Sequence, residues 1–223
     1  MKEIVPIQQK VVARNDDLAA RLAEQFADRR IYVFNLLSSP GSGKTSLLER
    51  LLPRLSAQLR CGVIEGDVQT ENDARRIARV GAPVRQIITC GTCHLDAQMI
   101  LDHVDGLPLD ELDVIFIENV GNLVCPSSYW LGEDSRLVIL STTEGDDKPA
   151  KYPAVFRKAD LLVINKIDLL PHTDFDLDQA VRYARGLNPD LVVFPVSCRT
   201  GEGLDSLAAW LVDKALEKKG SSS

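Results

Sequence analysis

The residue types that could do chemistry gather first in Ser38–Thr45, whose sequence SSPGSGKT departs from the phosphate-loop pattern G-x-x-x-x-G-K-[ST] only at its first position. Gly41 and Gly43 let the backbone turn so that its N–H groups point at phosphate oxygens. In this pattern Lys44 reaches the β- and γ-phosphates and the Thr45 hydroxyl ligates Mg²⁺. We therefore predict a nucleoside triphosphate site rather than a Gly/Ser turn that happens to precede a lysine. The expected nucleotide-binding residues of this loop are Gly41, Ser42, Gly43, Lys44, Thr45 and Ser46.

A second pattern, N-K-x-D, predicts which base the nucleotide carries. The Asp168 carboxylate can accept hydrogen bonds from guanine N1–H and the 2-amino group, whereas adenine offers neither donor. Lys166 would lay its aliphatic stem along the base, and Asn165 would tie this loop to the phosphate loop. At the next strand end, Ser197 and Cys198 would supply backbone donors to guanine O6. These residues predict GTP rather than ATP.

Two acidic residues at expected strand ends complete the predicted nucleotide site. Asp67 stands in EGDVQT, and Glu118 ends VIFIE. Because Mg²⁺ bound to one hydroxyl and two phosphates keeps several waters, nearby carboxylates hold those waters. We therefore expect Thr45, Asp67 and Glu118 around Mg²⁺, and with Lys44 these are the expected catalytic residues. Spacing identifies no group that orients the attacking water, so we expect slow intrinsic hydrolysis.

Three further residues could bind a softer metal. Cys93 and His94 are adjacent in the chain, and Cys125 follows Glu118 closely. Thiolate and imidazole ligands suit Zn²⁺ or Ni²⁺, and three ligands leave one position open or invite a symmetry mate. A pair of packed thiols remains the alternative. The segment from Cys90 to His94 also matches C-x-x-C-H, the haem attachment pattern, but that pattern requires an exported, oxidising context.

Hydrophobic periodicity predicts the elements that must position these residues. Expected strands are 31–37, 63–65, 84–89, 114–118, 137–141, 161–165 and 192–196, and expected helices are 15–30, 44–59, 72–80, 95–104, 176–185 and 204–218. Pro53 should kink or interrupt the second of these helices. Continuous apolar strands that alternate with helices predict an α/β P-loop NTPase with a mostly parallel, doubly wound sheet.

Composition limits the class of protein. The 223 residues carry a formal net charge of −6, without the clustered Lys and Arg that nucleic-acid binding requires. No apolar run approaches the roughly 20 residues of a membrane span. Five cysteines, an odd number, indicate reduced thiols, so we expect a cytoplasmic protein. We expect an N-terminal extension with a helix at 1–30, one GTPase domain at 31–219, fraying from Glu217 and a disordered tail at 220–223.

The motif set as a whole resembles the HypB family, the GTPases of nickel insertion into [NiFe]-hydrogenase. It comprises SSPGSGKT, EGDVQT, CHLDA, ENVGNLVCP, TEGDDKPxKYP, NKxD and an S-x-[KR]-x-G pattern at Ser197–Gly201, and it covers nearly the whole chain from Ile31 onward. The resemblance implies a fold of the signal-recognition-particle/MinD-like (SIMIBI) GTPase class, GTP-dependent homodimerisation, and nickel or zinc at Cys93, His94 and Cys125. It also implies partnership with a HypA-type nickel chaperone and a hydrogenase large-subunit precursor.

Two departures from the family pattern bear on metal binding. Residues 1–30 contain neither Cys nor His, so we expect no storage of several nickel ions there. Cys90 stands where the family motif has Thr, so it is not counted among the ligands. Lys148 and Lys151, which follow an expected strand end, could add positive charge across a dimer interface.

Other functions stay open from sequence. A urease GTPase chaperone resembles this chain in its phosphate loop and NKxD, but that family uses a Cys-Pro-His ligand motif, whereas this chain has Cys-His and a separate Cys-Pro. A small-molecule P-loop kinase would need an acceptor pocket and has no use for NKxD. A protein that binds GTP without turnover is the third alternative.

Overall fold

The computed structural model describes residues 7–69 and 72–220. Within them one seven-stranded sheet runs in the order β3-β2-β4-β1-β5-β6-β7. Every strand pair is parallel. The strands are β1 Tyr32–Ser38, β2 Cys61–Asp67, β3 Val84–Ile88, β4 Val114–Glu118, β5 Ser135–Ser141, β6 Leu161–Asn165 and β7 Val192–Pro195. The predicted parallel, doubly wound α/β sheet is confirmed.

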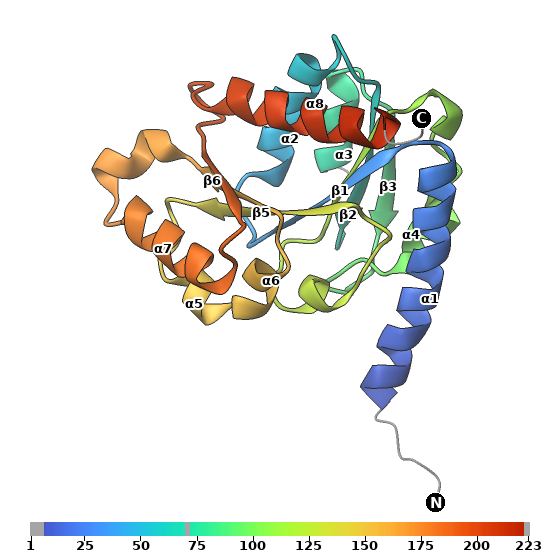
Figure 1. Cartoon of the computed structure of the whole chain (residues 1–223), viewed down its shortest axis with the longest axis horizontal. Coiled ribbons are helices and arrows are strands. Elements are labelled where there is room, and N and C mark those ends of the chain that lie inside the picture. Colours follow the sequence, from blue (N-terminus) through green and yellow to red (C-terminus); the bar gives the residue numbers. More distant parts are fainter. Residues whose placement is uncertain (1–6, 70–71, 221–223) are drawn as a thin grey trace, which may run out of the picture.

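Helices cover both faces of this sheet. They are α1 Ile7–Asp28, α2 Lys44–Leu55, α3 Asn72–Arg79, α4 Ala97–Val104, α5 Lys148–Lys151, α6 Pro153–Arg157, α7 Leu177–Leu187 and α8 Leu204–Gly220. Helices α2, α3 and α8 pack on one face, whereas α1, α4, α6 and α7 pack on the other (Figure 1). None of the helices in the described ranges is both long and apolar enough to cross a membrane.

The buried residues of β1 show why a continuous apolar run serves such a strand. Phe34 and Leu36 contribute to the core under α2 and α8. Val33, on the opposite face, packs in the core that α1 and α4 cover, and Leu37 packs in the core beneath α6 and α7. Successive side chains point to opposite faces of a strand, so a sheet covered on both faces needs apolar residues at every position.

Two predicted helix boundaries are wrong for identifiable reasons. Helix α1 begins at Ile7 rather than residue 15, and the polar Asn15 lies inside it. The Asn15 side chain is buried, where it accepts from the Ala97 N–H at 2.8 Å and donates to the Trp130 carbonyl at 2.7 Å. Helix α2 ends at Leu55 rather than at residue 59, within one turn of Pro53, which lacks a backbone donor.

The C-terminal end of α8 also differs from expectation. The helix does not fray from Glu217 but continues to Gly220. Lys218 donates to the Ile31 carbonyl and to Asp134, each at 2.7 Å, and Lys219 binds Asp113. These bonds tie the last turn to the residues that immediately precede β1, β4 and β5. Residues 221–223 of the predicted tail lie outside the described residues, and the predicted domain boundaries stay a prediction.

Two short helices have no periodic signal in the sequence. Helices α5 and α6 have four and five residues, too few to display a 3.6-residue repeat. Each has proline in its first turn, a position where the missing N–H is tolerated. They follow β5 and precede β6, and they place the TEGDDKPxKYP segment beside the phosphate loop.

Candidate functional site

The phosphate loop and the NKxD loop are joined directly. Asn165 Nδ2 donates to the Ser42 carbonyl at 2.9 Å, and Lys166 Nζ donates to the Gly41 carbonyl at 2.8 Å. Gly43 has φ of +99°, and a Cβ there would lie 2.5 Å from Asn165 Nδ2. Glycine is therefore required at Gly43 for its backbone conformation and for its closeness to Asn165. The predicted contact of Asn165 with the phosphate loop is present.

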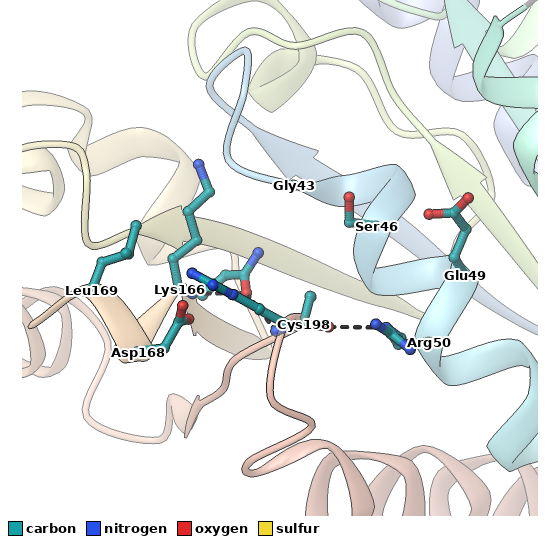
Figure 2. Close-up of a pocket in the computed structure, with 10 residues that line it drawn as sticks. Gly43, Ser46, Glu49, Arg50, Lys166, Asp168, Leu169 and Cys198 are labelled. Atoms are coloured by element: carbon teal, nitrogen blue, oxygen red, sulfur yellow. Dashed lines mark hydrogen bonds between the residues drawn. The ribbon is translucent and has the colours of Figure 1, made fainter.

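A cavity of about 360 Å³ lies beside this junction (Figure 2). Lys166, Asp168 and Leu169 line one side of it. Helix α2 lines the other side with Ser46, Glu49 and Arg50. The Ser197 hydroxyl donates to Asp168 Oδ1 at 2.6 Å and so orients the carboxylate. The cavity has the size to take a nucleotide base, with the Asp168 carboxylate among its lining groups.

Cys198 lines this cavity and Ser197 precedes it in the chain, but their backbone donors differ from the expectation. The Ser197 N–H donates to the Glu202 carbonyl at 3.0 Å, and the Cys198 N–H faces Asn165 Oδ1 at 3.3 Å. Both expected donors to guanine O6 are thus engaged within the chain. Ser197 acts instead through its hydroxyl, while the Cys198 carbonyl accepts from Arg50 at 2.9 Å. Burial raises the pKa of the Cys198 thiol to about 11, which keeps it protonated.

The serine at the first position of the phosphate loop has a partner of its own. Ser38 is fully buried, and its hydroxyl accepts from Lys44 Nζ at 3.1 Å. Burial lowers the pKa of Lys44, and the nearby Glu118 carboxylate opposes that shift. The Thr45 hydroxyl donates to Glu118 Oε1 at 2.7 Å. Lys44 and Thr45 therefore lie next to the acidic end of β4, and their roles at the phosphates and at Mg²⁺ stay predictions.

Two serines of the phosphate loop serve its packing. The Ser42 hydroxyl oxygen lies 2.6 Å from Glu144 Oε1 and 2.9 Å from the Ser39 carbonyl, and its single hydrogen donates to one of these two acceptors. Ser42 is fully buried, so its contribution to phosphate binding is limited to its backbone. The Ser46 hydroxyl accepts from Arg76 Nη2 at 3.0 Å, which connects α2 to α3.

Sequence reasoning missed Glu65. This residue lies opposite Glu118 in the β2–β4 register, and both side chains are buried. Burial raises the pKa of Glu65 to about 8 and that of Glu118 to about 7, and the negative charge of Glu118 adds to the shift at Glu65. Each carboxylate has an Oε2 atom with no hydrogen-bond partner. The available signal was the i, i+2 spacing of Glu65 and Asp67, which places both on one strand face.

These acids fit a hard divalent cation. Carboxylate oxygens of Glu65, Asp67 and Asp73 lie within 4.8 Å of one another. The same acids line a cavity of about 280 Å³ together with Lys44 and Glu118. Buried carboxylate oxygens without partners and a threonine hydroxyl form an all-oxygen donor set, which is the set that Mg²⁺ prefers. Asp67 and Glu118 thus line the same cavity, with Glu65 beside it, and their role at Mg²⁺ stays a prediction.

The predicted soft-metal ligands also meet. Ligand atoms of Cys93, His94 and Cys125 lie within 4.8 Å of one another. The His94 ring stacks on Tyr129 with centroids 4.1 Å apart, and its Nδ1 is buried without a hydrogen-bond partner. Burial lowers the pKa of His94, which favours the neutral imidazole that metals bind. Cys90 is exposed and lies outside this cluster.

One short segment connects the two sites. On the nucleotide side, Glu118 bonds Thr45, and Gly121 packs so closely on Pro40 that a Cβ there would lie 3.0 Å from the Pro40 Cα. On the metal side, Asn119 and Asn122 reach the loop that carries Cys93 and His94. Within residues 118–122, Glu118 and Gly121 therefore contact the nucleotide side, whereas Asn119 and Asn122 contact the metal side.

The metal-side contacts of residues 118–122 are made by two amides. Asn119 Oδ1 accepts from the Leu95 N–H at 3.2 Å, and Asn122 Nδ2 donates to the Cys93 carbonyl at 3.4 Å. Asn122 Oδ1 also accepts from the Val124 N–H at 2.8 Å. Neither asparagine has a sequence signal that indicates this role, because the partner segment lies more than twenty residues away in the chain.

The two lysines of the TEGDDKPxKYP segment have partners within the chain. Lys148 Nζ donates to Ser39 Oγ at 3.1 Å, at the phosphate loop. Lys151 pairs with Asp147 at 2.7 Å, and its side chain is 60% exposed. A role for either across a dimer interface stays a prediction.

Comparison with known proteins identifies the family. Residues 32–195 match the CobW/HypB/UreG nucleotide-binding domain. The hydrogenase maturation factor HypB of Escherichia coli K12 is 49% identical over 210 residues, which cover 94% of this chain and 72% of the relative. The chain belongs to the HypB family. Another HypB relative, the hydrogenase/urease maturation factor of Helicobacter pylori, is 40% identical over 97% of this chain and 90% of its own length.

Solved HypB structures agree with this assignment. The crystal structure of Helicobacter pylori HypB in complex with nickel superimposes with a TM-score of 0.87 at 40% identity, covering 94% of this chain and 99% of that one. The signal recognition particle receptor FtsY of Elizabethkingia anophelis matches with a TM-score of 0.56 at 17% identity, over 95% of this chain and 81% of that one. The latter shows a shared fold alone, that of the SIMIBI GTPase class, as predicted.

Proposed function

We propose that this HypB-family chain is a GTP-hydrolysing metallochaperone that delivers nickel to a [NiFe]-hydrogenase large-subunit precursor. The observation that carries the proposal is the convergence of Cys93, His94 and Cys125 within 4.8 Å, next to a segment that also contacts the phosphate loop. A metal cargo site and a nucleotide site thus share one structural element. That arrangement suits a protein whose metal affinity depends on its nucleotide.

The nucleotide chemistry follows from the residues already placed. The backbone N–H groups of the phosphate loop bind the phosphates, and Lys44 neutralises charge that develops on the β- and γ-phosphates during hydrolysis. Asp168 selects guanine. Thr45, Asp67 and Glu118 would hold Mg²⁺, with Glu65 and Asp73 close by. When bound, Mg²⁺ neutralises phosphate charge and draws the developing negative charge toward the leaving group.

The cargo chemistry rests on ligand softness. Two thiolates and one imidazole favour Ni²⁺ or Zn²⁺ over Mg²⁺, so the two sites discriminate by donor type. The nickel complex of the Helicobacter pylori HypB structure supports nickel as the cargo. Zinc stays the competing metal. Three ligands from one chain leave a coordination position for a fourth ligand, which a second copy of the chain or a HypA-type chaperone supplies during transfer.

Metal affinity depends on the nucleotide because residues 118–122 contact both sites. A segment that the γ-phosphate and Mg²⁺ hold relaxes when that phosphate leaves. Cys125 follows this segment directly, whereas Cys93 and His94 belong to a different loop, so relaxation displaces one ligand relative to the other two. By linkage, bound metal alters nucleotide affinity by the same factor that nucleotide alters metal affinity, on a scale of about 5- to 150-fold.

Titration of nickel in the presence of GDP or of a non-hydrolysable GTP analogue tests this dependence. We expect different nickel dissociation constants in the two states. Cys125→Ser should weaken binding in both states, whereas the matched variant Cys90→Ser, outside the cluster, should leave both constants unchanged. Equal constants with the two nucleotides would refute the coupling, and an unaltered constant in Cys125→Ser would refute the site.

Metal stoichiometry measured on size-separated protein tests the proposed dimer. With the GTP analogue we expect a GTP-dependent homodimer that carries the metal, and with GDP a shift toward monomer. Lys148 and Lys151 are proposed to contribute charge across that dimer, and Lys151→Ala should weaken it. An unchanged elution volume with either nucleotide contradicts the proposal.

One comparison supports a second protein to which nickel could be delivered. The Helicobacter pylori relative is named a hydrogenase/urease maturation factor, so delivery toward urease is the second candidate function. Co-purification with a hydrogenase large-subunit precursor, against a urease apoprotein as competitor, separates the two. A small-molecule kinase is disfavoured because Asn165 and Lys166 build a loop suited to guanine, and phosphate release from GTP without an added acceptor tests that alternative.

A further inference from the structure

The side-chain amide of Asn119 lies between the nucleotide site and the metal ligands. Asn119 is 1% exposed, and its Oδ1 accepts from the Val120 N–H at 2.9 Å and from the Leu95 N–H at 3.2 Å. Asn119 follows Glu118, the partner of Thr45, and Leu95 follows His94. The Asn119 Oδ1 atom therefore links the segment that follows Glu118 to the residue that follows the metal ligand His94.

Leu95 is held from a second direction by the acidic strand end. It is fully buried, and a Cβ on Gly66 would lie 2.7–2.9 Å from three of its side-chain carbons. Gly66 stands between Glu65 and Asp67. The Leu95 side chain thus packs directly on the backbone that carries two of the carboxylates, and its N–H is bonded beside the third, Glu118.

We propose that Asn119 is the positioning residue through which the nucleotide state reaches His94 and Cys93; this inference rests on the proposed dependence of metal binding on nucleotide. A buried N–H that loses its acceptor is strongly disfavoured, so Leu95 follows Asn119 when residues 118–122 move. Close packing against Gly66 prevents Leu95 from turning aside without displacing its neighbours. Asn119 thereby carries the displacement to the loop with two ligands, while Cys125 moves with its own segment.

Nickel titrations of three proteins test this role, each with GDP and with the non-hydrolysable GTP analogue. The measured quantity is the ratio of the two nickel dissociation constants. In the parent we expect a ratio of about 5 to 150. In Asn119→Ala we expect a ratio clearly smaller than that of the parent, because Leu95 no longer follows residue 119 and only the displacement of Cys125 remains.

Asn35→Ala is the matched control. Asn35 is fully buried and binds the other end of the same amide, since Asn119 Nδ2 donates to Asn35 Oδ1 at 3.3 Å. Its truncation disturbs the same part of the core but leaves the bond between Asn119 and Leu95 in place. We therefore expect Asn35→Ala to keep the parent ratio, whatever its effect on stability.

The outcomes separate the inference from the function on which it rests. A parent ratio of 1 overturns the proposed nucleotide dependence in the unmutated protein. If Asn119→Ala keeps the ratio of nickel dissociation constants found in the parent, the role of Asn119 is overturned. The same holds if Asn35→Ala lowers that ratio as much as Asn119→Ala does. Hydrogen exchange at the Leu95 amide tests the inference in the parent protein without a variant. In nickel-loaded protein, the protection of this amide should differ between GDP and the GTP analogue. Equal protection overturns the inference.

Discussion

The Ser197 hydroxyl donates to Asp168 Oδ1 across 2.6 Å, so the turn after β7 orients the carboxylate that follows β6. Asp168 is therefore fixed before any base arrives. A preoriented acceptor discriminates well between ligands, because a base without matching donors leaves the carboxylate unpaired. If Asp168 reads the base as proposed, base selectivity depends on both loops.

Asp168→Asn should weaken GTP binding about 10- to 100-fold, because the amide places a donor where guanine also donates. Calorimetry with GTP, GDP and ATP measures the change. Asp190→Asn, an exposed acid in the turn before β7, is the control and should bind like the parent. The GTP affinity of Ser197→Ala should lie between those of Asp168→Asn and the parent, since the Asp168 carboxylate stays but loses the hydroxyl that orients it. Parent-like GTP affinity in Asp168→Asn contradicts the assignment.

Lys44→Ala should reduce the turnover number for GTP about 100- to 1000-fold, because it removes a positive charge that stabilises the transition state. Steady-state phosphate release measures this effect. Lys214→Ala changes a lysine of α8 that pairs with Glu217, and it should hydrolyse GTP at the parent rate. Turnover retained in Lys44→Ala would place the phosphate site elsewhere.

The depressed pKa of Asp113 predicts how the free energy of unfolding depends on pH. The Asp113 side chain is 7% exposed, and this burial alone would raise its pKa. Hydrogen bonds from Arg60 and Lys219 outweigh the effect of burial. They hold the pKa of Asp113 at about 2, against an ordinary value of 3.8. The folded pKa is depressed, so this carboxylate contributes stability above pH 4 that is lost as pH falls toward 2. The shift corresponds to about 2 kcal/mol of unfolding free energy.

Urea unfolding of Asp113→Asn tests this expectation. The variant should be less stable than the parent by about 2 kcal/mol at pH 7, and the difference should shrink below pH 4. Asp110→Asn removes an exposed partner of Arg29 and should change stability by less than about 1 kcal/mol. A difference between parent and Asp113→Asn that does not vary with pH would assign the effect to packing.

Gly66→Ala should destabilise the protein by about 1–3 kcal/mol, because the new methyl group overlaps the Leu95 side chain. In a Leu95→Ala background the space is free, and the same substitution should cost less than half as much. Thermal or urea unfolding of the four proteins in this cycle measures the interaction between the two positions. Additive effects would show that Leu95 is not what excludes a side chain at Gly66.

The sequence determined those parts of the site that are contiguous in the chain. A phosphate loop and an N-K-x-D loop each depend on a few neighbouring residues, whose glycines and polar groups dictate local backbone and chemistry. Buried parallel strands likewise have a local signature, because apolar residues occupy every position. Most strands were therefore placed within one or two residues, whereas α1, α5 and α6 were misjudged where polar or short segments gave no periodic signal.

The tertiary structure decided which distant residues meet. Strand order places β2 beside β4, and only that order brings Glu65 opposite Glu118. Asn119 binds Leu95, and Asn15 binds Ala97 at the start of α4, across 24 and 82 residues of chain. Such pairings follow from how helices and strands pack around a shared core, and a buried amide takes whichever acceptor or donor that packing brings within reach.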